Sequence, residues 1–286
     1  MLATGDHVWT QVHLHLATDT PEEHAVRLLG PTLIALEDQG LIDCWHFLRK
    51  GDRWRLRYRE VASGTLEATA TATAAAVNEV LDMCREAGMI DDWTPAIYEP
   101  ETYVFGGAAA LPAAHRLFHQ DSRHALTYLT AVHRGELSDQ RAELWLLLGT
   151  AAMRGAGLDW YEIGDTWAQV AENRSADGPG LAVSDRRLVD AARTLLRADT
   201  TPGSALLEGR LAHAASWFGA FAVYGLTLRV LADEGQLWRG QRAVLAHHQL
   251  FTANRLGLPH QQQAALATAA AGAVLDLVDA NEAVLR

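Results

Sequence analysis

Side chains that can move protons gather in the second half of the chain, beginning with one stripe. His213, Ser216, Trp217, Ala220 and Tyr224 recur at helical spacing, so on one long helix they would share a face. Hydroxyl and imidazole groups beside an indole suit proton transfer to a stacked aromatic substrate. The alternative is a helix packed inside a bundle, with its polar groups bonded internally.

A second candidate group is the segment from His247 to Gly257. On a helix, His247 shares a face with Phe251 and Asn254, and His248 lies beside it. Imidazole titrates near neutral pH, so His247 is a candidate acid or base, with His248, Asn254 and Arg255 as candidate substrate contacts. A histidine on a helix is also an ordinary core or surface residue, and that interpretation stays open.

Arginine alternates along the segment from Asp52 to Arg59. Because strand side chains alternate between faces, Arg53, Arg55, Arg57 and Arg59 are expected on one face. Guanidinium groups pair bidentately with carboxylates, which predicts a platform for an acidic peptide. The alternative is a solvated outer face of a sheet.

Other chemical signatures are weak. His115 and His119 are spaced i, i+4 on a helix, but no third metal ligand accompanies them, so we predict no metal site. Neither a phosphate-binding glycine loop nor a Gly-x-Ser-x-Gly elbow occurs.

The first hundred residues predict a small sheet. Alternation predicts strands at 7–16, 44–50, 54–61 and 94–98, with helices at about 20–40 and 66–87. Gly51 and Asp52 predict the hairpin turn between the second and third strands. The order βαββαβ is that of a ferredoxin-like unit, which makes the fold class α+β.

Beyond Gly107, alanine, leucine and arginine recur at helical spacing. The predicted helices span about 110–134, 138–156, 159–173, 184–198, 206–234, 239–256 and 260–280, and residues 175–180 form a glycine- and proline-containing loop. We therefore expect a ferredoxin-like portion at 1–106 and a helical portion at 107–286 packed on it as one compact unit.

Composition limits the partners. The chain has 286 residues, a net charge of -11 and two cysteines, so we expect a globular protein with reduced, buried thiols. The negative charge opposes nucleic-acid binding, which needs a basic face. The start of the chain lacks a signal-peptide pattern and no apolar run reaches about 18 residues, which predicts a cytoplasmic protein without a membrane partner.

Several motifs together resemble the thiopeptide-type bacteriocin biosynthesis domain found at the C-terminus of lantibiotic dehydratases. They are Trp9 to Leu14, Trp45 to Arg49, the arginine strand, the segment Tyr98 to Gly107 with Asp121 and Ser122, and Asn254 to Gly257. The resemblance implies the fold predicted above. The family includes glutamate-eliminating domains and stand-alone pyridine synthases.

The chain departs from the eliminating relatives at two positions. Their Tyr-x-x-Glu-x-x-Arg pattern matches Tyr98 and Glu101, but valine stands at position 104 in place of arginine. A histidine four residues before the asparagine of the late motif is replaced by Leu250. The arginines that serve the glutamyl-ester step correspond to Arg55 and Arg57, and Arg53 stands where the family usually has histidine.

These departures favour a pyridine synthase. The resemblance then implies a formal [4+2] aza-cycloaddition between two dehydroalanines of a thiazole-bearing precursor peptide, with loss of water and leader peptide and without a metal or organic cofactor. We assign proton movement to Ser216, Tyr224 and His247, and place Glu101 and Tyr98 near the reacting centre. Trp217, His248, Asn254 and Arg255 would contact the substrate.

Arg55 and Arg57 would bind the leader peptide, and the sequence leaves a homodimer open. One alternative is an eliminase that makes dehydroalanine from glutamylated serine with a rearranged site. The other is a non-catalytic partner that binds the leader and presents the precursor to another enzyme.

Overall fold

A computed structural model describes residues 9–16, 21–50, 53–60, 66–174 and 185–275 of the chain. The chain divides into two compact units, each with its own internal contacts. The first comprises Met1–Pro100 and Phe118–Asp139, and the second comprises Glu101–Leu117 and Gln140–Arg286.

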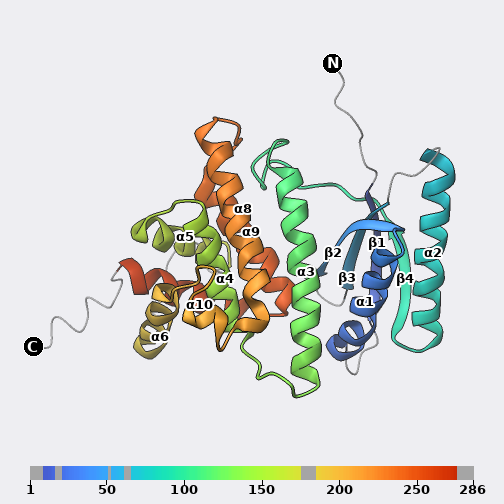
Figure 1. Cartoon of the computed structure of the whole chain (residues 1–286), viewed down its shortest axis with the longest axis horizontal. Helices are drawn as coiled ribbons and strands as arrows, with labels where there is room; N and C mark the ends of the chain where they lie inside the picture. Colours follow the sequence, from blue (N-terminus) through green and yellow to red (C-terminus); the bar gives the residue numbers. More distant parts are fainter. Residues whose placement is uncertain (1–8, 17–20, 51–52, 61–65, 175–184, 276–286) are drawn as a thin grey trace, which may run out of the picture. The chain divides into compact units, whose positions relative to one another are not determined.

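The first unit contains a four-stranded antiparallel sheet (Figure 1). Its strands are β1 (Trp9–Leu16), β2 (Ile42–Lys50), β3 (Arg53–Glu60) and β4 (Ile90–Ala96), in the spatial order β2-β3-β1-β4. Helices α1 (Pro21–Asp38) and α2 (Leu66–Glu86) follow β1 and β3 in the chain. The predicted βαββαβ order and the α+β class are confirmed.

Alternation gives the sheet one apolar face and one arginine face. Val12, Leu14, Leu56 and Tyr58 are buried on the face that packs against α1 and α2. Arg57 lies on the other face, opposite Gln11 of β1 and His46 of β2 in the register. The period of two therefore separates the core from the arginine row, as predicted.

The fourth strand begins earlier than predicted. The expected span of 94–98 is wrong, because β4 pairs with β1 from Ile90 opposite Leu16 to Ala96 opposite Gln11. Pro95 lies within β4, where an edge strand tolerates a residue without an N–H group. The predicted turn at Gly51 and Asp52 lies outside the described residues.

The free edge of β2 is closed by side chains of α3 (Leu111–His133), whose residues from Phe118 belong to the first unit. The Trp45 N–H donates to His119 Nδ1 at 3.3 Å, and the Phe47 N–H donates to Ser122 Oγ at 3.2 Å. Burial lowers the pKa of His119, which favours the neutral ring, and Nδ1 also lies 3.1 Å from the Trp45 carbonyl oxygen. His119 and Ser122 thus provide hydrogen-bond acceptors for the outer edge of β2.

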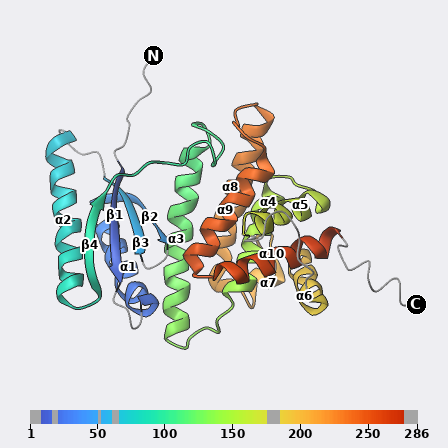
Figure 2. The same ribbon diagram turned by 180° about the vertical axis from the view of Figure 1, so that it is seen from behind.

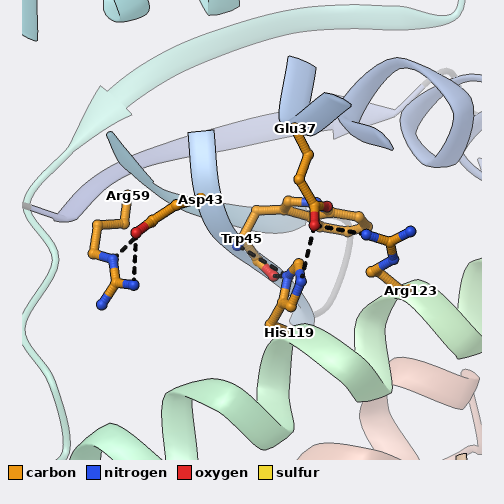
Figure 3. Close-up of polar contacts among 6 residues, drawn as sticks. All are labelled: Glu37, Asp43, Trp45, Arg59, His119 and Arg123. Atoms are coloured by element: carbon orange, nitrogen blue, oxygen red, sulfur yellow. Dashed lines mark hydrogen bonds and ion pairs between the residues drawn. The ribbon is translucent and has the colours of Figure 1, made fainter. Parts of the chain in front are cut away.

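Glu37 of α1 contacts the side chains of Trp45, His119 and Arg123 beside the β2 edge (Figure 3). Its carboxylate accepts from Trp45 Nε1 at 3.0 Å and from Arg123 at 2.6 Å, and lies 3.5 Å from His119 Nε2. The indole, the imidazole and the guanidinium therefore share one anion.

The second unit is helical in its described part. Its helices are α4 (Arg141–Gly155), α5 (Trp160–Glu172), α6 (Arg186–Arg197), α7 (Ala205–Glu208), α8 (Ala215–Asp233), α9 (Gln241–Leu256) and α10 (His260–Leu275). Most bounds agree with the predicted helices to within a few residues, and α10 is described to Leu275. The predicted loop at 175–180 lies outside the described residues. Figure 2 shows the same helices from behind.

The single helix predicted at 206–234 is wrong. Gly209 ends α7 with φ -111° and ψ -111°, and a 3-10 turn at Ala212–Ala214 precedes α8. His213 therefore lies on this turn, and the predicted stripe does not begin on one helix. A Cβ added at Gly209 would lie only 2.8 Å from the Ala205 carbonyl oxygen, so glycine suits this break.

Helices α4 and α8 approach each other through glycines. A Cβ on Gly225 would collide with the carbonyl oxygen of Ala152 and lie 2.7 Å from the Ala156 nitrogen. A Cβ on Gly155 would likewise meet the backbone of Ala222. The two backbones are in contact where side chains usually intervene, and this fixes the position of α8.

The segment Ala212–Asp233 is long and apolar enough to cross a bilayer by length and composition alone. Core helices of soluble proteins pass the same test. Trp217, Phe218, Phe221 and Tyr224 of this segment are buried in the second unit, whereas its Val223, Leu226 and Val230 are exposed.

Candidate functional site

The segment that follows Tyr98 folds into a compact turn from Glu101 to Gly107. The Phe105 N–H donates to the Glu101 carbonyl at 3.2 Å, and the Gly107 N–H donates to the Thr102 carbonyl at 2.8 Å. Gly106 and Gly107 have φ of 95° and 98°, a region that favours glycine. Gly107 also packs on an indole, because an added Cβ would lie 2.6 Å from Trp238 Cδ1.

This turn places the Glu101 side chain in contact with His247 of helix α9. The ring of Phe105 lies 5.2 Å from that of His247 and 4.7 Å from that of His248. Glu101 Oε2 lies 3.3 Å from His247 Nε2, with side-chain exposures of 47% and 22%. A carboxylate and an imidazole that reach solvent together can orient and exchange a proton.

A second pair lies deeper in the same unit. The ring of Tyr224 on α8 lies 4.3 Å from that of His248 on α9. Burial raises the pKa of Tyr224 well above its ordinary value, so this side chain stays a neutral phenol. Its hydroxyl is buried and has no hydrogen-bond partner among the described residues.

His248 is uncharged for a related reason. Burial, and then the positive charges of His247 and Arg255, hold the pKa of His248 well below 6.5. Phe105 therefore separates a partly exposed pair, Glu101 and His247, from a buried neutral pair, Tyr224 and His248. The second unit brings together four of the predicted site residues.

The remaining residues of the predicted stripe lie apart from these pairs. Trp217 is 1% exposed and faces the core of the second unit, whereas Ser216 is on the exposed side of α8. His213 is exposed on the turn before α8. Their assigned roles stay predictions.

The late motif ends helix α9. Asn254 Oδ1 accepts from Arg174 at 3.2 Å and from Gln263 Nε2 at 3.0 Å, and Gly257 caps the helix with φ 74°. Arg255 is 1% exposed. Substrate contacts for Asn254 and Arg255 therefore stay predictions beside this structural role.

In the first unit, Arg57 and Tyr98 are held together. Arg57 Nε donates to Gln11 Oε1 at 2.7 Å, and its guanidinium lies 4.7 Å from the centre of the Tyr98 ring. Arg57 Nη1 also lies 3.4 Å from His46 Nε2. Arg57 is 5% exposed and therefore connects the side chains of Gln11, His46 and Tyr98 within its face of the sheet.

Arg55 differs from Arg57 because it is half-buried rather than buried. It stands opposite His13 of β1. Burial lowers the pKa of His13, and the charges of Arg55, Arg53, His15 and Arg57 add to that effect. This face of the sheet is therefore electropositive around Arg55.

Sequence reasoning missed two connecting residues. Phe105 joins the Glu101 turn to both histidines, and Gln11 holds Arg57. An aromatic residue just before a glycine pair was the available signal for Phe105. Gln11 carried none beyond its place on the polar side of β1.

The described residues contain no cluster of three or more histidine, cysteine, aspartate or glutamate side chains arranged to hold a metal. The second unit has a pocket of about 200 Å³, and half of its lining residues are leucines, among them Leu144 and Leu147 of α4. None of the predicted site residues lines it, so we do not place the chemistry there.

The pKa of His248 leads to a stability prediction. The pKa of His248 is lower in the folded protein than in the unfolded chain, so on acidification the unfolded chain takes up the proton first. The stability that neutral His248 contributes is therefore lost as the pH falls from 6.5 toward the folded pKa. We expect His248→Phe to reduce the fall in Tm between pH 7.5 and pH 5.5, because the phenyl ring has no proton to gain in either state.

Thermal melts of both proteins at the two pH values check this. Other buried histidines, such as His119, titrate equally in wild type and variant and cancel in the comparison. Equal slopes for the two proteins would contradict the assignment.

Comparisons with known proteins agree with this architecture. The tRNA-dependent lantibiotic dehydratase MibB from Microbispora sp. 107891 matches at a TM-score of 0.71 and 21% identity, over 100% of this chain. The chain spans only 29% of MibB. No curated protein sequence matches significantly.

Two shorter proteins match over nearly their whole length. The pyridine synthase TbtD from thiomuracin biosynthesis matches at a TM-score of 0.64 and 17% identity, over 94% of this chain and 98% of TbtD. TsrL matches at a TM-score of 0.56 and 17% identity, over 94% of this chain and 96% of TsrL. These likenesses establish a shared fold.

The sequence model of one family matches residues 9–274, which include most of both units and every predicted site residue. The chain therefore belongs to the lantibiotic biosynthesis dehydratase C-terminal family.

Proposed function

We propose that this protein is a thiopeptide pyridine synthase that acts on a ribosomally made precursor peptide. Family membership and a fold like that of TbtD over nearly all of both chains support this proposal. The reaction would be a formal [4+2] aza-cycloaddition of two dehydroalanines. Water and the leader peptide would then leave, and the new ring would become an aromatic pyridine within a macrocycle.

The observation that carries the proposal is the pair of Glu101 and His247 beside Phe105. The reaction needs one backbone amide in its iminol form, which requires a proton to leave nitrogen and another to reach oxygen. A partly exposed imidazole 3.3 Å from a carboxylate suits this relay, because the carboxylate orients the ring and stabilises its protonated form. Such proton transfers contribute about 10²- to 10⁴-fold.

Tyr224 and His248 would support the same centre with uncharged groups. Because Tyr224 stays a phenol, it can donate a hydrogen bond but supplies no negative charge. Ser216 keeps its proposed part in proton movement, and Trp217, Asn254 and Arg255 are proposed to contact the substrate. Holding two alkenes at reacting distance can contribute about 7 to 11 kcal/mol, and no organic or metal cofactor is required by this scheme.

Mass spectrometry of the purified protein with a linear thiazole peptide tests the proposal. The peptide carries its leader and preformed dehydroalanines. The expected products are free leader and a macrocycle lighter by the leader and one water. Intact substrate after long incubation, with peptide bound, would favour a non-catalytic partner protein.

A second candidate is glutamate elimination, and one contact favours it. Arg239 Nη1 donates to the Val104 carbonyl at 3.3 Å, so an arginine from the α8 to α9 loop reaches the position where the eliminating relatives carry their own. Arg239, Glu101 and His247 could then form a rearranged elimination site. Loss of glutamate mass from a glutamylated serine peptide would establish this reaction instead.

Arg55 is the better probe of leader binding on the arginine face. We expect Arg55→Glu to weaken an acidic leader peptide about 3- to 10-fold, since a half-buried ionic contact is lost and replaced by repulsion. Fluorescence anisotropy with a labelled leader measures this. Arg57 is unsuitable, because its reversal would break its bonds to Gln11 and His46.

The matched control is Arg134→Glu, an arginine with 67% side-chain exposure in the same unit. It changes net charge equally but lies at the end of α3. Equal weakening by both variants would assign the effect to net charge and remove Arg55 from the leader site.

A further inference from the structure

Two aromatic rings of the second unit lie on its surface beside the Glu101 turn. Tyr103 is 60% exposed and Trp238 is 57% exposed. Tyr103 is part of the turn, and Trp238 precedes α9 in the loop after α8. Tryptophan is highly buried on average, so an indole with this exposure calls for an explanation.

Both residues are tied to their surroundings. The backbone N–H of Trp238 donates to the Gly106 carbonyl at 3.0 Å, and the indole lies against Gly107, where an added Cβ would come within 2.6 Å of Cδ1. Arg239 bonds the Val104 carbonyl, and its guanidinium lies 6.0 Å from the centre of the Tyr103 ring. The turn and the loop therefore fix each other, as their adjacent course in Figure 1 shows.

This surface belongs to the same short turn as the candidate centre. Tyr103 is two residues from Glu101, and Phe105 follows two residues later against His247. Trp238 packs on Gly107 at the end of the turn. A peptide bound at Glu101 and His247 would therefore have its neighbouring residues within reach of these rings.

We propose that Tyr103 and Trp238 form a stacking surface for the planar azole rings of the precursor peptide. This inference rests on the proposed function. Exposed rings favour a flat heteroaromatic partner, which gains offset stacking at little cost in side-chain entropy. The guanidinium of Arg239 beside Tyr103 can donate to an azole nitrogen, which an aliphatic side chain would not use.

Binding without turnover tests the surface. The probe is a labelled linear peptide with two thiazoles and serines in place of dehydroalanines, compared with the same peptide carrying alanine at the thiazole positions. We expect tighter binding of the thiazole peptide by wild type. Trp238→Ala and Tyr103→Ala should each weaken it about 3- to 10-fold and leave the alanine peptide unchanged.

Controls separate stacking from stability. Tyr161→Ala removes another exposed tyrosine of the second unit, with 68% exposure on α5, and should have no effect. Trp238→Phe should retain most of the affinity, because a ring still covers Gly107. Tyr103→Ala leaves the Trp238 contacts intact, so it remains decisive if Trp238→Ala melts early.

Equal affinity of wild type for both peptides would overturn the inference, as would unchanged thiazole binding in Tyr103→Ala. Loss of a homodimer in Trp238→Ala, seen by sedimentation, would assign the rings to a contact between copies instead. Ring-dependent thiazole binding without macrocycle formation would refute only the proposed reaction. Macrocycle formation with unaffected variants would refute only the stacking surface.

Discussion

Replacing His247 with alanine is expected to slow macrocycle formation by about 10²- to 10⁴-fold, the range of a lost general acid or base. The imidazole is 3.3 Å from Glu101 and reaches solvent, so its removal would delete the proposed proton relay while Phe105 still packs on His248 and Phe251. Single-turnover release of leader, followed by mass spectrometry, measures the rate. Saturating enzyme separates this chemical step from binding.

Glu101→Gln tests the partner of the same relay. The amide keeps the size of the carboxylate but cannot stabilise a protonated imidazole, so we expect a smaller fall, about 10- to 100-fold. His260→Ala provides the matched control, since His260 is exposed at the start of α10. Full activity of His247→Ala would contradict the assignment of the pair to catalysis.

Gly225→Ala is expected to destabilise the second unit by about 3 kcal/mol, the upper range of overpacking. The added methyl meets the carbonyl oxygen of Ala152 and comes 2.7 Å from the Ala156 nitrogen, and neither backbone atom can move without shifting α4. Tyr224 is the preceding residue, so the shift would also disturb its contact with His248. Denaturant unfolding monitored by circular dichroism measures the loss.

Gly219→Ala is the control on the same helix. No atom lies within 4 Å of its added Cβ, so the substitution should stabilise α8 by up to about 1 kcal/mol through helix propensity. Similar unfolding curves for Gly225→Ala and wild type would mean that α4 and α8 can separate at no cost, contrary to their glycine contact.

Local patterns predicted the sheet unit well because each strand has one apolar and one polar face. In β1 and β3 the alternating pattern matches the structure, because Leu14 and Leu56 are buried on one face and Arg57 lies on the other. The start of β4 could not be found this way. It depends on pairing with β1, which is a long-range property.

The sequence named candidate residues one at a time, but it could not show how they are arranged. Glu101 and His247 are 146 positions apart, and their contact depends on a turn whose glycines pack on Trp238. The helical spacing from His213 to Tyr224 misled because it assumed a continuous helix, whereas Ala212–Ala214 form a 3-10 turn. Periodicity describes one element and carries no information on how elements meet.

Both edges of the sheet disfavour the addition of a peptide as a further strand. A strand added beside β2 would need the N–H groups of Trp45 and Phe47, and these already donate to His119 and Ser122. A strand added beside β4 would meet Pro95, which has no N–H to donate. A precursor peptide that bound this unit would therefore be recognised mainly through its side chains, and the charge of its leader would matter more than its capacity to become a fifth strand.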